Sequence, residues 1–389
     1  MSAELLPGNR IELLASGAQF FPALQAAIAA AQCEIHLETY IFADDETGRA
    51  TVAALAAAAL RGVTVRVLVD GFGARDFPAG LGRALTAAGG QLEIYRSEVG
   101  RLKIRRHRLR RLHRKIAVID GRIAFVGGIN LIDDEDTPGL GPRYDYAVRV
   151  TGPLVARIHA SARRLWRQVG WARLQRRPPP VPISPCADDL PAGKMAAAFV
   201  IRDNLRHRRD IEEAYLDAIA AAQREVLIAS AYFLPGRRFR QALRAAAARG
   251  VTVTILLQGQ VEYALLHYAT QALYRQLIAD GVQIHEYQAG FLHAKVAAVD
   301  GLWATVGSSN IDPFSLLLAR EANVVVLDAG FAGELRASLL DAIATQALLV
   351  GAVDLQRAGL PARMLRWAAY GLVRLMLGIT RYGGSDYRE

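Results

Sequence analysis

The sequence of 389 residues lacks an apolar run long enough to cross a bilayer, which takes about 20 residues. Its first residues, MSAELLPGNR, also lack the basic-then-apolar build of a signal peptide. We therefore expect no spanning helix and a location inside the cell. The two cysteines, Cys33 and Cys186, offer neither a disulfide framework nor metal-ligand spacing. We expect two free thiols, no metal and no other cofactor.

Lysine is scarce as well. Of the 47 basic residues only four are lysines: Lys103, Lys115, Lys194 and Lys295. Two of these, Lys115 and Lys295, each follow a histidine by two positions. Lysine carries a compact point charge, whereas the guanidinium of arginine is a planar fork. The presence of lysine at these two positions therefore indicates that an arginine would not fit there. The net charge of +10 points to an anionic partner, such as nucleic acid, a membrane surface or a phosphorylated substrate.

Part of the sequence occurs twice. The strings RLHRKIAVIDG (111–121) and FLHAKVAAVDG (291–301) place His, Lys and Asp at the same intervals. Segments 27–42 and 218–233 also match, and the order of the elements is the same in both halves. The spacing is far longer than that of a solenoid repeat. We therefore predict an internal duplication.

Each half alternates Ala-rich helical stretches with β-branched runs, such as 63–69 and 251–257. This alternation predicts an α/β fold with a parallel or mixed sheet. Between the halves lies the proline-rich string RRPPPVPISPCADDLPAGK, which can continue neither a helix nor a central strand. We place the N-terminal lobe at 1–175, a linker at 176–194, the C-terminal lobe at 195–350 and a tail at 351–389.

The repeated motif carries chemistry. Positions i and i+2 of a strand share a face, so the histidine and lysine of each motif project together. If the halves pack about a pseudo-twofold axis, two such pairs meet in one site: His113 with Lys115, and His293 with Lys295. One histidine would attack as nucleophile and the other would act as acid and base. The lysines would neutralise a phosphoryl group without a metal.

Each motif then reaches an Asp-Gly turn. We count Asp120 and Asp300 as catalytic motif residues, but at the turn we expect them to brace the backbone rather than touch reacting atoms. The following strand ends in VGGIN or VGSSN, where glycine and short side chains allow an anion to approach. Asn130, Asn310 and Ser308 are the predicted phosphate contacts.

A reactive histidine needs its second ring nitrogen held by an acceptor, usually a carboxylate. Asp145 in YDYAV and Glu321 in REANV occupy equivalent places, each in a β-type stretch downstream of the histidine of its own half. We assign both as orienting carboxylates. The alternative is an exposed or salt-bridged surface acid.

These residues resemble the phospholipase D superfamily, whose signature HxK(x)4D(x)6GSxN occurs twice. The second copy matches in full, and the first has Gly128 in place of Ser. Within the superfamily the chain is most similar to bacterial cardiolipin synthases of the B type, in the strings LETYIFADDETGR, YDYAVRVTGP and the two motifs. The resemblance implies two pseudo-symmetric α/β/α sandwich lobes with one shared active site at their interface.

The resemblance also implies an activity. One phosphatidylglycerol would transfer its phosphatidyl group to a histidine and release glycerol, and the hydroxyl of a second phosphatidylglycerol would then take it, giving cardiolipin. We assign His113 as nucleophile and His293 as acid and base, and the reverse stays open. Phosphatidylethanolamine or a small alcohol is the alternative second substrate. The alternative functions are a phospholipase D-type hydrolase, a nuclease and a non-enzymatic binding module.

Two segments bear on the partner. The basic segment 101–115, RLKIRRHRLRRLHRK, is predicted to gather anionic head groups, and its lack of aromatic residues argues against nucleic acid. The tail PARMLRWAAYGLVRLMLGITR has arginines on one helical side and apolar residues on the other, typical of a helix lying in a membrane interface. The alternative is a helix docked on the core. We expect a peripheral protein on the cytoplasmic side of a bacterial cell membrane.

Overall fold

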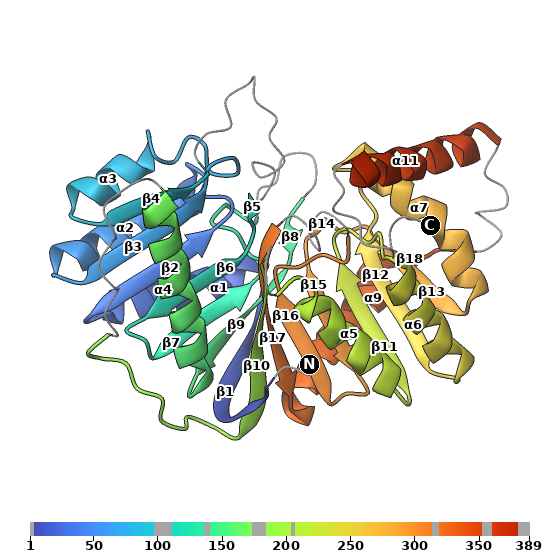
Figure 1. The fold of residues 1–389 in the computed structure, drawn as a ribbon, viewed down its shortest axis with the longest axis horizontal. Helices are drawn as coiled ribbons and strands as arrows, with labels where there is room; N and C mark the ends of the chain where they lie inside the picture. The colour runs from blue at the N-terminus through green and yellow to red at the C-terminus, as the bar shows by residue number, and fades with distance from the viewer. Residues whose placement is uncertain are drawn as a thin grey trace.

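The computed structural model describes residues 4–96, 111–135, 141–172, 184–203, 207–312, 319–351 and 360–379. Two lobes of the same design lie side by side (Figure 1). The N-terminal lobe contains β1 (Leu6–Ala15), α1 (Ser16–Ala30), β2 (Glu34–Thr39), α2 (Glu46–Leu60), β3 (Thr64–Asp70), α3 (Leu81–Ala87), β4 (Gln91–Tyr95), β5 (Arg111–Leu112), β6 (Lys115–Ile119), β7 (Ile123–Gly127), β8 (Arg143–Tyr144), β9 (Tyr146–Thr151) and α4 (Leu154–Ala172).

The C-terminal lobe repeats this order and ends in an additional helix. Its elements are β10 (Met195–Arg202), α5 (Asp210–Ala221), β11 (Glu225–Ser230), α6 (Arg237–Ala248), β12 (Thr252–Gln258), α7 (Ala264–Ala279), β13 (Val282–Tyr287), β14 (Phe291–Leu292), β15 (Lys295–Val299), β16 (Trp303–Gly307), β17 (Ala319–Leu327), α9 (Ala329–Gln346), β18 (Ala347–Leu349) and α11 (Leu360–Ile379).

One sheet runs through both lobes. Its order is β18-β13-β12-β11-β15-β16-β17-β10-β1-β9-β7-β6-β2-β3-β4, with β5 paired to β17 off this path. In each lobe three parallel strands (β2-β3-β4 and β11-β12-β13) continue into an antiparallel set. The predicted α/β fold with two equivalent lobes is confirmed. The joint, an antiparallel pairing of β1 with β10, was not predicted.

The lobes also share a hydrophobic core. Each lobe has its own cluster, and a third cluster combines buried residues from both. That shared cluster includes Ile116 of β6 in the N-terminal lobe and Val296 of β15 and Leu335 of α9 in the C-terminal lobe. Burial of apolar surface at the lobe boundary stabilises one relative placement of the lobes, so groups at their interface keep a fixed geometry.

The Asp-Gly turns lie at the far ends of β6 and β15 from the motif histidines. Asp120 and Asp300 have φ of +54° and +53° in these turns. The Asp120 carboxylate accepts N–H groups of residues 32–34 at 2.7–2.9 Å. Asp300 accepts those of residues 223–225, each at 2.8 Å. The two carboxylates therefore hold the loops that lead into β2 and β11, the parallel strands that pair with β6 and β15.

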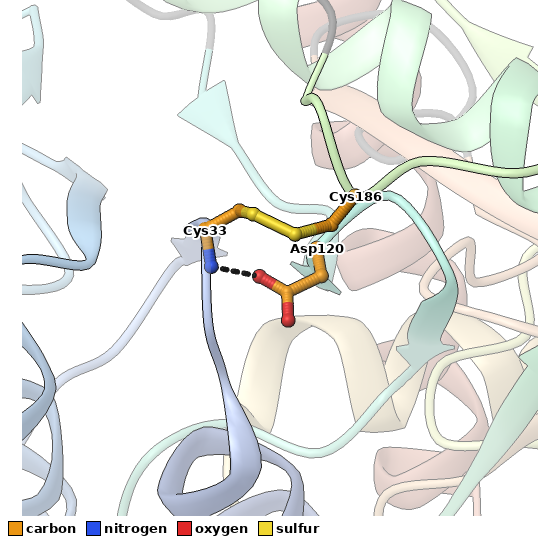
Figure 2. Close-up of side chains that lie close together, drawn as sticks. All are labelled: Cys33, Asp120 and Cys186. Carbon is orange, nitrogen blue, oxygen red and sulfur yellow. Dashed lines mark hydrogen bonds between the residues drawn. A yellow bond between two sulfur atoms is a disulfide. The ribbon is translucent and has the colours of Figure 1, made fainter.

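The expectation of two free thiols was wrong. Cys33 and Cys186 form a disulfide across 153 positions of sequence, beside the Asp120 carboxylate (Figure 2). Cys186 lies in the chain that precedes β10, and this segment returns to the loop between α1 and β2. The sequence did not reveal the pair because a long separation says nothing about distance in space. The disulfide ties the end of the predicted linker to the N-terminal lobe.

Candidate active site

The first motif places its histidine and lysine at the lobe interface. His113 follows β5, Lys115 begins β6, and the Nζ atom of Lys115 donates to the carbonyl of His113 at 2.6 Å. Arg114 points to the opposite face of the strand and binds Glu38 and Ser161. Because side chains of a strand alternate between its two faces, His113 and Lys115 share one face and Arg114 on the other face fixes the strand beneath α4.

The carboxylate partner of His113 comes from the other lobe. His113 Nδ1 lies 2.9 Å from Oε1 and 3.1 Å from Oε2 of Glu321. Glu321 is fully buried in β17, and the Ser308 hydroxyl donates to its Oε2 at 2.5 Å. The backbone supports the contact, because His113 N–H donates to the Arg320 carbonyl at 3.0 Å. The carboxylate thus holds the ring and leaves Nε2 for chemistry.

The second motif makes the reciprocal contact. His293 Nδ1 lies 2.6 Å from Oδ2 of Asp145, and His293 N–H donates to the Tyr144 carbonyl at 2.9 Å. Lys295 donates to the carbonyl of His293, and its Nζ lies 3.8 Å from Asp145 Oδ2. The two halves of the site therefore have the same design.

The sequence analysis assigned Asp145 and Glu321 as orienting carboxylates and associated each with the histidine of its own half. In the structure the pairs cross between the lobes: Asp145 holds His293 and Glu321 holds His113. The physical reason lies in short parallel pairings, β5 with β17 and β8 with β14, which bring each motif against the carboxylate-bearing segment of the other lobe. Neither motif histidine therefore has its carboxylate partner in its own lobe.

Burial controls the protonation of the site. It lowers the pKa of Lys115 to about 7 and that of Lys295 to about 8. It also lowers the pKa of both histidines, with the charge of Lys295 adding to the effect at His293. Burial raises the pKa of the Asp145 carboxyl to about 6. Neutral imidazoles can attack or accept a proton, and an anion between the lysines would restore their full charge.

The predicted phosphate contacts are all buried. Asn130 accepts the Ile41 N–H through Oδ1 at 3.1 Å, and Asn310 is 2% exposed. Ser308 directs its hydroxyl at Glu321. Phosphate binding by these three residues stays a prediction.

Gly128, the departure from the motif, has a steric reason. A Cβ atom there would lie 2.3 Å from Oδ1 of Asp145. Its counterpart in the second lobe is Ser308, whose hydroxyl binds the longer Glu321 side chain. Glycine with aspartate in one lobe and serine with glutamate in the other are two ways to seat a carboxylate beside the opposite histidine.

Sequence reasoning missed several residues around the site. The Tyr40 ring packs on His113 with 5.1 Å between ring centroids, and the Lys115 Nζ lies 5.5 Å from the Tyr40 centroid. Arg143 lies over the Phe291 ring at 4.9 Å. Tyr40 lies in a repeated segment, 27–42, but Ala231 stands at its place in the second copy, so the duplication gave no indication of its role.

Among the described residues, one buried cluster could hold a metal by composition: Glu34, His36 and His159. Arg66 Nη1 already lies 2.9 Å from Glu34 Oε2 and 3.3 Å from His36 Nε2. This cation neutralises the carboxylate, so we assign the cluster to a structural charge network. The basic segment 101–115 lies outside the described residues except for 111–115.

Comparison with known families and curated proteins agrees with the geometry. The family model described as "Cardiolipin synthase, PLD-like domain" matches residues 24–166 and 215–342. Cardiolipin synthase B of Salmonella typhi is 45% identical over 344 residues, which cover 85% of this chain and 80% of that protein. Cardiolipin synthase B of Escherichia coli K12 is 43% identical over 349 residues, covering 87% and 81%.

Solved structures share the fold. Phosphatidylserine synthase of Haemophilus influenzae matches with a TM-score of 0.70 at 14% identity, covering 98% of this chain and 97% of that one. Polyphosphate kinase of Porphyromonas gingivalis matches with a TM-score of 0.59 at 15% identity, covering 96% and 54%. At such identities the likeness shows the two-lobed architecture alone.

Proposed function

Because the chain belongs to the cardiolipin synthase family of phospholipase D-like phosphatidyltransferases, we propose that it joins two phosphatidylglycerol molecules into cardiolipin and glycerol. The observation that supports this most is the two crossed pairs of a motif histidine with a buried carboxylate, with a buried lysine beside each histidine. Such a site suits two successive displacements at one phosphorus atom.

In the first step Nε2 of His113 attacks phosphorus, forming an N–P bond as the P–O bond to glycerol breaks. At this step His293 has to be protonated on Nε2, a form that the bound phosphodiester anion favours, and it gives this proton to the departing glycerol oxygen. In the second step His293 takes the proton from the hydroxyl of a second phosphatidylglycerol, whose oxygen attacks phosphorus and displaces His113. Lys115 and Lys295 neutralise the phosphoryl charge in both steps. Glu321 and Asp145 hold the two rings throughout.

We assign the nucleophile to His113, whose carboxylate partner is fixed by a second hydrogen bond. Glu321 receives both the imidazole and the Ser308 hydroxyl. The His113 side chain is also the more exposed of the two, 17% against 10% for His293. A fixed and more accessible ring suits attack on a bulky phospholipid.

The substrates lie in a bilayer, and among the described helices none is both long and apolar enough to span one. We therefore place the protein at the surface of the bacterial cell membrane, on its cytoplasmic side. We divide the chain into lobes at 1–175 and 195–350, a linker at 176–194 and an amphipathic basic tail at 351–389.

The test is to incubate the purified chain with phosphatidylglycerol vesicles, without added metal, and to follow lipids and glycerol by mass spectrometry. We expect cardiolipin and glycerol in equal amounts. His113→Ala and His293→Ala should each lower the rate by about 10²–10⁴-fold. His285→Ala serves as the control, because His285 lies in β13, beside β18 at the edge of the sheet.

Phosphatidic acid without cardiolipin would show that water takes the second step and that the protein is a hydrolase. An unchanged lipid profile would refute the proposal. Vesicles that also contain phosphatidylethanolamine test which lipid is the donor, because release of ethanolamine would show that phosphatidylethanolamine can replace the phosphatidylglycerol that gives up its phosphatidyl group.

A further inference from the structure

Helix α11 packs against the C-terminal lobe with the side that does not carry its large apolar residues. Ala369 and Val373 of α11 are buried in the core of the C-terminal lobe, and Tyr370 packs against that core. Helix α11 packs along α7, and Arg366 is half-buried. The side that faces the protein therefore includes polar residues of the helix.

The apolar side of α11 faces outward. It carries large apolar side chains at helical spacing, and Met364, Trp367 and Leu375 are 71%, 58% and 59% exposed. An amphipathic helix of a globular protein normally buries such a stripe. We call this stripe the outer apolar face; its members are Leu360, Met364, Leu365, Trp367, Leu372, Leu375 and Met376.

Two loops add exposed apolar side chains near the site. Phe72 follows β3, is 48% exposed and lies under Arg111 of β5, with 4.9 Å from the guanidinium carbon to the ring centroid. Tyr263, which precedes α7, is 56% exposed. The ring of Tyr40 packs on His113, and burial raises the pKa of Tyr40. Tyr263 adds to this rise, so Tyr263 lies close to Tyr40.

The outer apolar face and the site lie toward the same side of the molecule. In Figure 1, α11 runs along the upper edge of the C-terminal lobe above α7, and β5, β8 and β14 lie toward the upper side between the lobes. These short strands directly precede His113, Asp145 and His293.

We propose that the outer apolar face of α11, together with Phe72 and Tyr263, inserts into the head-group layer of an anionic bilayer and presses the mouth of the active site against the lipid. This inference rests on the proposed function in one respect only: the purpose of membrane binding would be to deliver phospholipids to the site. The binding itself is independent of catalysis.

Charge and side-chain type favour a lipid surface over a protein partner. The chain carries a net charge of +10, and Arg363 and Arg374 border the apolar stripe, with the Arg374 guanidinium 5.8 Å from the Tyr370 ring centroid. Trp367, which is 58% exposed, has the amphipathic ring that favours the boundary between water and acyl chains. Apolar insertion combined with attraction to anionic lipid is the usual basis of interfacial binding.

The experiment is vesicle flotation of the full-length protein with a Leu372→Asp/Leu375→Asp double variant. Vesicles contain phosphatidylcholine alone or a mixture with phosphatidylglycerol. Leu302→Asp is the matched control, because Leu302 is 50% exposed, against 48% for Leu372, and lies in the turn after Asp300, at the opposite strand end from the site. We expect the double variant to lose at least about 10-fold in partitioning to anionic vesicles and the control to bind as wild type.

A second measurement does not require acidic residues to be introduced into the outer apolar face. Lipids brominated in the acyl chains should quench the tryptophan fluorescence of the wild type, and Trp367→Phe should remove most of that quenching. Quenching that is unchanged in Trp367→Phe, or equal flotation of the double variant and the wild type, would overturn the proposal. A dimer in solution that the Leu372→Asp/Leu375→Asp change dissociates would also overturn it, because a second copy would then cover the face.

His293→Ala keeps the two proposals apart. It should bind vesicles as the wild type does, since binding needs no turnover. Vesicle binding through α11 without any cardiolipin product would leave the docking surface standing and refute the function. Cardiolipin synthesis, together with vesicle binding that is the same in the double variant and the wild type, would support the proposed function and refute the docking surface.

Discussion

The Nδ1 atom of His113 lies 2.9 Å from Oε1 of Glu321, a residue 208 positions away and in the other lobe. The reciprocal pair, His293 and Asp145, is separated by 148 positions. Each lobe therefore supplies a motif histidine and the carboxylate that binds the motif histidine of the other lobe. A movement between the lobes would disturb both pairs at once, and the shared hydrophobic core opposes such movement.

The crossed pairs predict which histidine each carboxylate serves. Glu321→Gln should impair formation of the phosphatidyl-enzyme, and Asp145→Asn should impair proton transfer by His293, each with a loss in kcat of about 10²–10⁴-fold. Head-group exchange with labelled glycerol and pH–rate profiles distinguish the two steps. Thermal melting shows whether the fold is kept. Full activity in either variant would refute its orienting role.

Gly128 should not tolerate a side chain. Gly128→Ala places Cβ against the Asp145 carboxylate, so we expect a loss of stability of about 1–3 kcal/mol and a fall in kcat as His293 loses its alignment. Gly333→Ala, in α9, is the control because nothing lies within 4 Å of a Cβ there. The measurement is urea unfolding with a parallel activity assay. If both variants behave alike, the steric explanation fails.

The buried lysines predict a dependence of stability on pH. Burial lowers the pKa of Lys115 to about 7, while an unfolded lysine titrates near ~10.4. Between these values the unfolded state binds more protons, so the contribution of Lys115 to the free energy of unfolding rises with pH over this window. Below pH 7 both states are protonated and the contribution is constant at its least favourable value.

Lys115→Met removes this contribution. Relative to the wild type, the variant should therefore have its greatest advantage in stability below pH 7 and lose it steadily toward pH 10, as measured by urea unfolding at a series of pH values. A difference in stability that is independent of pH would contradict the lowered pKa. Activity should fall in the wild type as the pH rises through 7–8, because Lys115 and Lys295, with pKa values of about 7 and 8, lose the charges that neutralise phosphate.

The disulfide should matter for stability more than for catalysis. Cys33 and Cys186 lie beside Asp120, at the end of β6 opposite to Lys115. Reduction should lower the free energy of unfolding by about 2–4 kcal/mol, because it releases a long closed loop in the unfolded chain. A Cys33→Ser/Cys186→Ser variant should melt like the reduced wild type and be insensitive to reductant. Mass spectrometry that finds two free thiols in protein purified without reductant would refute the pairing.

The motifs along the chain predict the composition of the site and the duplicated fold. The repeated His-x-Lys spacing identifies the site residues because a strand places alternate side chains on one face. The duplicated order of elements predicts two equivalent lobes, and the Asp-Gly turns predict that Asp120 and Asp300 brace the backbone, as their hydrogen bonds show. These features depend on contacts within a few residues or on a pattern that occurs twice, so they are visible along the chain.

The contact partners of these residues and strands could be identified only from the three-dimensional arrangement of the chain. That Asp145 serves His293, that Cys33 meets Cys186 and that one sheet joins the lobes through β1 and β10 all depend on segments far apart in sequence. The same holds for α11: its pattern predicts an amphipathic helix, but only packing against α7 decided that the apolar side faces outward. Side-chain periodicity defines the faces of an element, whereas the surface that each face meets is decided by how the whole chain buries its core.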